Sequence, residues 1–332
     1  MIDSYQLIIQ NIESGEIFDV SELASQIRYF SDMEGQPGKL SFILEKDPND
    51  ILKISVGSIV LFKVVEDKVE KGIFFGYIFT LGTDATEAYE VVAYDQMRYL
   101  KNENVLNMEN ETASTWFNRI CNILSIGGNR CSIITPSSYV LPTRLFNKQS
   151  YYSMIDWACK ETLLKSKDKP FYFIRDVFGV LEFNELENAK TDYIIGDESM
   201  LTDYKYELDI DSDTYNKVSI VKVSEKEGKI IRKYAESTVN RIKWGDLGFI
   251  KTVGDKMEEK EMQDYANQIL LLKNRVKKTM KLNALGIPDL RAGSSFLFRL
   301  NKLNIMEWMY ITSITHNYDK DFHTMEMEVS II

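Results

Sequence analysis

Three aspartates in the second half of the chain have the spacing of a metal-binding loop. Asp209, Asp211 and Asp213 alternate with Ile210 and Ser212 in the stretch LDIDSDTYNK. Carboxylates at every second position are how an EF-hand calcium loop begins. The rest of the stretch must decide between a calcium loop and a solvated acidic turn.

The residues that follow do not continue the calcium pattern. A loop that started at Asp209 would need Gly at its sixth position and Glu at its twelfth. The chain has Thr214 and Ile220 there, and Ile220 lies in NKVSIVKVS, which is a predicted strand and not the second helix of an EF-hand. We interpret the stretch as a solvated acidic link with a turn at 213–216. An irregular calcium site is the alternative.

Cysteine and histidine are scarce. The cysteines are Cys121, Cys131 and Cys159, an odd number without CxxC spacing, so we expect buried free thiols and neither a disulfide framework nor a zinc knuckle. The two histidines, His316 and His323, lie in the last β segment, where we expect surface or interface positions.

No familiar catalytic motif is present. The chain contains no G-x-S-x-G, H-E-x-x-H, phosphate loop or G-x-G-x-x-G. A carboxylate pair for glycoside hydrolysis could come from any of 50 acidic residues, which makes that possibility uninformative. We therefore predict no catalytic, cofactor-binding or metal site, and no enzyme activity. Six aromatic residues could line a sugar or base platform, but their spacing suits cores and subunit contacts better: Tyr94, Tyr99, Trp116, Tyr151, Tyr152 and Trp157.

Composition indicates a globular chain of two or three domains. The 332 residues are 44% hydrophobic and carry a formal charge of -10, which argues against wrapping nucleic acid. No stretch reaches the roughly 18 consecutive apolar residues of a membrane span, and the first residues do not look like a signal peptide. We expect synthesis in the cytoplasm, and neither stable membrane association nor specific nucleic-acid binding.

Hydrophobic periodicity predicts a mainly β, α+β fold in three parts. Residues 1–100 read as short strands, 101–205 as an α+β region, and 206–332 as strands around one long helix at 258–278. In the first part, KLSFILEK alternates as Leu40, Phe42 and Leu44 against Ser41 and Ile43, which predicts a strand. The middle region contains predicted helices at 112–124 and 150–165, followed by a hairpin in FYFIRDVFGVLEF.

The two ends of the chain repeat one pattern. GSIVLFK, FGYIFTL and AYEVVAYD near the start match GSSFLFR, WMYITSI and TMEMEVS near the end in order and approximate spacing. Each set has Gly-Ser, an alternating strand that ends in a cation, a strand with Tyr-Ile, and a strand that holds Glu. We infer similar β-domains at both ends, against the alternative that any two antiparallel meanders look alike.

The order of these segments resembles a known family. GQPGKLSFIL, FFGYIFTL, AYDQMRYLKN, DSDTYNKV and RAGSSF resemble the baseplate hub proteins of contractile phage tails and phage-tail-like bacteriocins. The most similar type is the hub of PBSX-like defective prophages, related to late control protein D. The resemblance extends from about residue 5 to 329, and AYDQMRYLKN and DSDTYNKV are its most specific parts.

The resemblance implies a mechanical role. Such hubs are trimers whose two tube-type β-barrel domains, here flanking the middle α+β domain, make a pseudo-six-fold ring. The implied partners are two further copies of the chain, the central spike, the tail tube and its initiators, the tape measure protein and other baseplate proteins. The alternatives are a cell-wall hydrolase with its site in 101–205, and a free carbohydrate-binding module.

Overall fold

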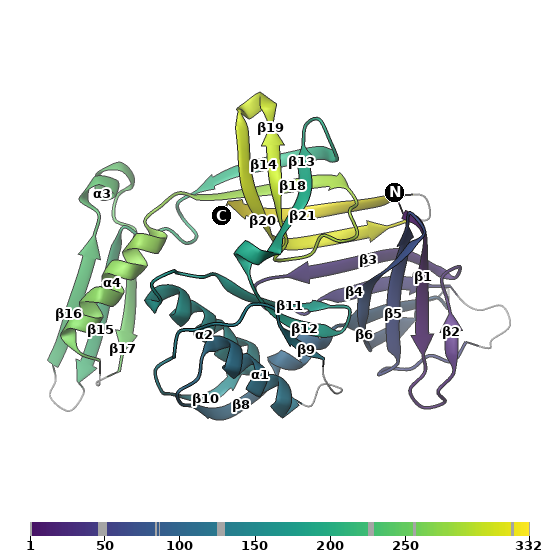
Figure 1. Ribbon diagram of the computed structural model, residues 1–332, viewed down its shortest axis with the longest axis horizontal. Helices are drawn as coiled ribbons and strands as arrows, with labels where there is room; N and C mark the ends of the chain where they lie inside the picture. Colours follow the sequence, from purple (N-terminus) through teal and green to yellow (C-terminus); the bar gives the residue numbers. More distant parts are fainter. Residues whose placement is uncertain are drawn as a thin grey trace. The chain divides into compact units, whose positions relative to one another are not determined.

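A computed structural model describes the chain as two compact units (Figure 1). The larger unit combines Met1–Lys205 with Lys281–Ile332, and the smaller one is Tyr206–Met280. Among the described residues no helix is both long and apolar enough to cross a membrane. The described residues are 2–45, 52–83, 85, 87–124, 130–224, 229–254, 257–319 and 322–331.

The larger unit is built on a 13-stranded sheet, so the fold is mainly β as predicted. Its order is β14-β18-β21-β20-β3-β4-β7-β6-β5-β1-β2, and β13 joins it through β19, which pairs with β20. The strands are β1 (Ile2–Gln10), β2 (Ile17–Asp19), β3 (Ala24–Asp32), β4 (Lys39–Leu44), β5 (Ile59–Glu66), β6 (Val69–Thr83), β7 (Tyr89–Tyr94), β13 (Lys190–Gly196), β14 (Leu201–Asp209), β18 (Lys277–Leu285), β19 (Ser295–Leu300), β20 (Ile305–Tyr318) and β21 (His323–Ile331).

The first strands bury alternate residues, as a half-buried strand requires. In β4, Leu40, Phe42 and Leu44 are buried, and the residues between them are partly exposed. They share a core with side chains of β1, β5 and β6, and Tyr318 of β20 reaches the same core from the other end of the chain. The predicted alternation in KLSFIL is confirmed.

The predicted helices of the middle region are confirmed. They are α1 (Ala113–Leu124) and α2 (Tyr151–Lys165), and the Ser150 hydroxyl caps α2 by accepting from the Ser153 N–H. The predicted hairpin is β11 (Tyr172–Val177) with β12 (Val180–Glu185). The region also holds β8 (Glu103–Met108), β9 (Cys131–Ile133), β10 (Arg144–Ser150) and the short 3₁₀ helices η1 (Gln96–Lys101) and η2 (Leu186–Ala189); a third, η3 (Asn301–Leu303), follows β19.

The prediction that all three cysteines are free thiols is wrong for two of them. Cys121 and Cys131 form a disulfide, whereas Cys159 is free and buried. The end of α1 packs beside β9, which brings the two Cα atoms to 6.4 Å. Because this proximity is tertiary, the spacing of the two residues in the sequence gave no signal for it.

The smaller unit packs one helix on a three-stranded sheet. The sheet has the order β16 (Lys229–Glu236), β15 (Lys217–Ser224), β17 (Gly248–Val253), and α3 (Thr238–Trp244) follows β16. The other helix, α4 (Glu259–Lys273), buries Met262, Ala266 and Ile269 against β15 and β16.

Helix α4 ends earlier than the predicted 278. It begins with a capping box between Glu258 and Glu261 and ends at Lys273, and strand β18 starts at Lys277. In β18 the buried residues alternate as Met280 and Leu282, which is a strand period. The predicted helix therefore ran too far and included the first residues of β18.

The first meander, β5-β6-β7, begins with a glycine turn. Gly57 has φ +85° and donates its N–H to the Ile78 carbonyl oxygen at 2.7 Å, and the Ile78 N–H donates to the Ser58 carbonyl oxygen at 2.9 Å. Between Ile78 and Thr80 the pairing of β6 with β7 is interrupted by a bulge.

The last meander, β19-β20-β21, repeats this geometry. Gly293 has φ +84° and donates to the Ile311 carbonyl oxygen at 2.9 Å, and the Ile311 N–H donates to the Ser294 carbonyl oxygen at 2.9 Å. The pairing of β20 with β21 is interrupted between Ile311 and Ser313. The two meanders therefore agree in their turns, their cross-strand bonds and the place of their bulges, which generic meanders would not share.

Candidate functional site

The acidic stretch that opened the sequence forms a hydrogen-bonded turn. The carboxylate of Asp209 accepts from the Ser212 hydroxyl, from the Asp211 N–H at 2.6 Å and from the Ser212 N–H at 3.3 Å, and these bonds lower its pKa. Asp213 forms an ion pair with Lys273. Among the described residues no group of three or more His, Cys, Asp or Glu is placed to hold a metal ion. The interpretation as an acidic turn accounts for these contacts.

Near the end of the same stretch, Asn216 connects three segments of the smaller unit by hydrogen bonds. Asn216 is fully buried, and its side-chain amide donates to the Gly245 carbonyl oxygen at 2.7 Å while its side-chain oxygen accepts from the Leu247 N–H at 2.9 Å. Its own N–H donates to the Leu247 carbonyl oxygen, and its carbonyl oxygen accepts from the Ser237 N–H. One asparagine thus joins the start of β15, the start of α3 and the turn before β17.

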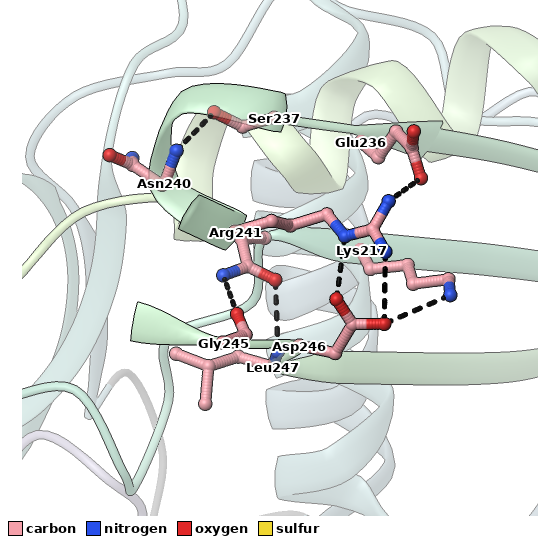
Figure 2. A network of polar contacts seen from close by, with 9 residues as sticks. Lys217, Glu236, Ser237, Asn240, Arg241, Gly245, Asp246 and Leu247 are labelled. Atoms are coloured by element: carbon pink, nitrogen blue, oxygen red, sulfur yellow. Dashed lines mark hydrogen bonds and ion pairs between the residues drawn. The ribbon is translucent and has the colours of Figure 1, made fainter. Parts of the chain in front are cut away.

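Ion pairs surround this turn (Figure 2). The guanidinium group of Arg241 contacts Asp246 at 2.6 Å and Glu236 at 2.7 Å, and Lys217 contacts Asp246 at 3.1 Å. These groups are partly exposed, so they contribute less than the buried amide of Asn216. The DSDTYNKV string is therefore explained as a structural motif.

The second specific string, AYDQMRYLKN, surrounds a buried carboxylate. Asp95 accepts from the Met97 N–H at 3.0 Å and from the Gly38 N–H at 2.9 Å. A Cβ atom at Gly38 would lie 2.1 Å from Asp95 Oδ2, so only glycine fits there. The two strings GQPGKL and AYDQ therefore meet in one contact, which fixes the entry of β4 against η1.

A second buried carboxylate lies nearby, in the β11–β12 turn. Asp176 accepts from the Gly179 N–H at 2.7 Å and from the Gln96 N–H at 3.4 Å. Burial raises the pKa of Asp176 to about 7, although Arg291 opposes the shift. Burial and the charge of Asp176 raise the pKa of Asp95 well above its ordinary value. Both carboxyl groups are buried, and the pair ties the first strands to the middle region.

The two histidines differ in exposure, because His323 is partly exposed and His316 is not. His316 is fully buried, so that prediction is wrong for it. Its Nε2 lies 2.9 Å from the Leu290 carbonyl oxygen and its Nδ1 lies 2.9 Å from His323 Nε2. A carbonyl oxygen only accepts, so Nε2 of His316 carries a proton and Nδ1 accepts from His323. Burial lowers the pKa of His316 to about 4 and that of His323 to about 3.

His316 belongs to a seam between the two ends of the chain. In this seam β20 pairs antiparallel with β3, and His316 lies opposite Tyr29. Arg291 is buried and donates to the carbonyl oxygens of Ile73 at 2.9 Å and Gly72 at 2.8 Å. Strands about 290 residues apart in sequence thus pair directly, and β20 and β3 lie side by side in Figure 1.

The six aromatic candidates do not form one platform. Trp116 is fully buried and stacks on Phe146, and the Tyr152 hydroxyl donates to the Met33 carbonyl oxygen at 2.9 Å. Trp157 contacts Phe146 edge to face, and Tyr151 lies in the same core. Tyr94 and Tyr99 contact Phe79 elsewhere, beside an open pocket lined by Phe30, Lys39, Phe79, Thr80, Tyr94 and Arg98 among others. Four of the six, Trp116, Tyr151, Tyr152 and Trp157, pack in or against one core, as their spacing indicated.

The chain is similar to known proteins over most of its length. A family model described as YQBQ-like matches residues 27–330. The chain belongs to the YqbQ-like family. The protein YqbQ of Bacillus subtilis (strain 168), described as uncharacterized, is 26% identical over 290 residues, which are 86% of this chain and 85% of that protein. The phage-like element PBSX protein XkdQ of the same organism is 25% identical and covers 83% of this chain and 82% of its own length.

A solved structure shares the fold of this family member. The 43 kDa tail protein of prophage MuSo2 from Shewanella oneidensis superimposes with a TM-score of 0.71 over 98% of both chains, at 12% sequence identity. At that identity the likeness shows the fold and not the residues of a site.

Proposed function

We propose that this chain is the structural baseplate hub of a contractile tail, in a phage or a phage-tail-like bacteriocin. It acts as a trimeric adaptor that joins the six-fold tail tube to the central spike and contacts the tape measure protein. It is made in the bacterial cytoplasm and assembled into the baseplate. The proposal is supported by family membership, by a relative from the phage-like element PBSX and by the fold of a prophage tail protein.

The repeated meander is the observation that carries the proposal. Gly57 and Gly293 start two segments with the same turns, bonds and bulges, so one chain contributes two similar units. Three such chains provide six similar positions around one axis. A duplicated unit is a simple way for a three-fold assembly to meet a six-fold tube.

Direct imaging of the particle tests the proposal. Tail particles carrying a tag on this chain are purified and imaged by cryo-microscopy. We expect three copies in a ring between tube and spike, each filling two of six similar positions. A different copy number, or a location outside the baseplate, contradicts the proposal.

No observation favours the hydrolase alternative. In the described part of 101–205, Trp116, Phe146 and Tyr151 fill one core, and the Ser150 hydroxyl caps α2. A zymogram on purified cell wall gives an independent check, and clearing by this chain alone would show an enzyme.

A further inference from the structure

One edge of β20 is shared by two strands in succession. Its first half pairs with β19, from Ile305 to Tyr310, and its second half pairs with β3, from Ser313 to Tyr318. The other edge is occupied by β21 along Met309 to Tyr318. The pairing with β3 is the place where the first and last meanders join.

The equivalent edge of β6 is only half used. Its first half pairs with β5 as far as Tyr77, just as β20 pairs with β19. By the shared turns and bulges, Ile78 corresponds to Ile311 and Thr80 to Ser313. In the described part of the chain no strand pairs with residues 80–82 on this side, where β20 has β3. Thr80 is exposed and lines the open pocket beside Phe79.

The counterpart of β3 in the last meander is β14. In the ladder, β7 is followed by β4 and then β3, and β21 is followed by β18 and then β14. The edge of β3 that faces away from β4 pairs with β20, whereas no strand of the described residues pairs with the corresponding edge of β14.

The two ends of the ladder differ in a way that supports pairing at β14. Strand β2, at one end, has three residues, and short edge strands resist further pairing. Strand β14, at the other end, has nine residues, LTDYKYELD, without proline. Long regular edges are templates for another strand. The edge of β14 is therefore suited to a partner strand.

We propose that β14 of one chain pairs antiparallel with residues 80–82 of β6 in a second copy of the chain. This contact repeats between subunits the β3–β20 contact that each chain makes internally. It is head to tail, because β14 and β6 are different surfaces, and three such contacts close a ring. The inference rests on the proposed trimeric hub and adds the strands that join its subunits.

Cysteine cross-linking in assembled particles tests the pairing. Two double variants are made, Thr80→Cys with Leu208→Cys and Thr80→Cys with Asp209→Cys. Thr80 corresponds to Ser313, which lies opposite Asp32 at the end of β3, and Leu208 and Asp209 are the last residues of β14, so either register brings one pair close. Thr80 and Leu208 are exposed and Asp209 is partly exposed, so the chain should keep its fold. Mild oxidation should give disulfide-linked dimers and trimers on non-reducing gels, and a reductant should return them to monomers.

Matched controls identify the edge. Ile17→Cys with Leu208→Cys uses an exposed residue of β2, at the far end of the ladder, and should give no trimer. Each single cysteine variant should also remain monomeric on the gel. Trimer formation by the Ile17 pair at the same rate as by the Thr80 pairs overturns the assignment.

A measurement without substitution gives a second test. Backbone amides of residues 80–82 and of β14 should exchange with deuterium at least tenfold more slowly in the particle than in the isolated chain. Particles with a three-fold ring but neither cross-links nor added protection overturn this pairing and leave the proposed function intact. Particles in which this chain forms no ring overturn both.

Discussion

Gly57 and Gly293 adopt the same left-handed backbone conformation at the start of equivalent strands. Their φ angles are +85° and +84°, and each N–H donates to the carbonyl oxygen of an isoleucine on the next strand. Glycine adopts this conformation without the strain that a Cβ atom introduces. The surroundings differ, however, because a Cβ at Gly293 would lie 2.1 Å from a ring carbon of Phe173, whereas at Gly57 the nearest atom is 4.0 Å away.

This difference predicts unequal costs for one substitution at two equivalent glycines. Gly57→Ala should lower the free energy of unfolding by about 1 kcal/mol, because only the backbone is strained. Gly293→Ala should cost about 2–4 kcal/mol, because overpacking against Phe173 is added. Urea titration of the full chain measures both values.

A double-mutant cycle isolates the contact. In a Phe173→Leu background the side chain is smaller, so Gly293→Ala should cost close to what Gly57→Ala costs. Equal losses at the two glycines in the unaltered background would contradict the assigned clash.

Asn216 should be the most sensitive polar residue of the smaller unit. Asn216→Ala removes a donor to Gly245 and an acceptor for Leu247 from a fully buried position. Buried groups left without partners cost about 1–3 kcal/mol each. We expect loss of hydrogen-exchange protection across β15 and β17.

A neighbouring exposed ion pair provides the control. Lys217→Ala removes the contact with Asp246, in which both side chains are well exposed, at 40% and 51%. Such pairs contribute about 0–1 kcal/mol. A loss of protection in this variant as large as that in Asn216→Ala would refute the assignment of the buried amide as the main contact.

The free energy of unfolding should depend on pH in part through Asp176. Its pKa in the folded chain is raised to about 7, above that of an unfolded aspartate, so the folded state retains a proton that the unfolded state loses. This contribution favours the folded state at low pH and is lost as pH rises through about 4 to 7. Arg291 and Asp95 face the same group and act in opposite directions.

Asp176→Asn should remove this pH-dependent contribution to the free energy of unfolding. The Asn oxygen can still accept from the Gly179 N–H, as the Asp176 carboxyl does at 2.7 Å. We expect the variant to gain stability relative to the unaltered chain as pH rises from 5 to 8, measured by urea titration at each pH. A difference between the two proteins that stays constant over this range would disprove the raised pKa.

The sequence predicted the elements better than the contacts between them. Periodicity placed both helices of the middle region and the alternation of Leu40, Phe42 and Leu44, because these depend on local spacing. The β3–β20 pairing joins the two ends of the chain, so no local pattern could predict it. The helical period near Val276 was misleading because an amphipathic strand begins directly afterwards.

The residues that make the buried polar contacts could not be predicted from the sequence. DSDTYNKV and AYDQMRYLKN are the most specific segments of the chain, but the alternating aspartates in the first resemble a metal-binding loop. Asn216 and Asp95, which are buried and make the connecting hydrogen bonds, carry no signal that separates them from surface residues in a single sequence. Their roles became visible only from burial and partners.

Thiol counting checks the cysteine assignment. In the native chain no cysteine should react quickly with a thiol reagent, because Cys159 is buried and burial raises its pKa, and the other two form a disulfide. Unfolding without reductant should expose one thiol, and unfolding with reductant should expose three. Three reactive thiols without reductant would show that Cys121 and Cys131 are not bonded.

His316 should impose the opposite pH dependence to Asp176. Its folded pKa is lowered to about 4 from the ordinary 6.5, so between these values the unfolded state binds a proton that the folded state does not. Stability from this group is therefore full above pH 6.5 and lost as pH falls toward 4, by up to about 1.4 kcal/mol per pH unit. His316→Gln removes the titration and keeps a donor for the Leu290 carbonyl oxygen. The stability of the unaltered chain relative to this variant should fall between pH 7 and pH 5 in urea titrations, and His323→Gln should show a change of the same sign because the pKa of His323 is also lowered. A stability difference between the unaltered chain and His316→Gln that does not change with pH would mean that the imidazole is not desolvated and that the β3–β20 seam is open to water.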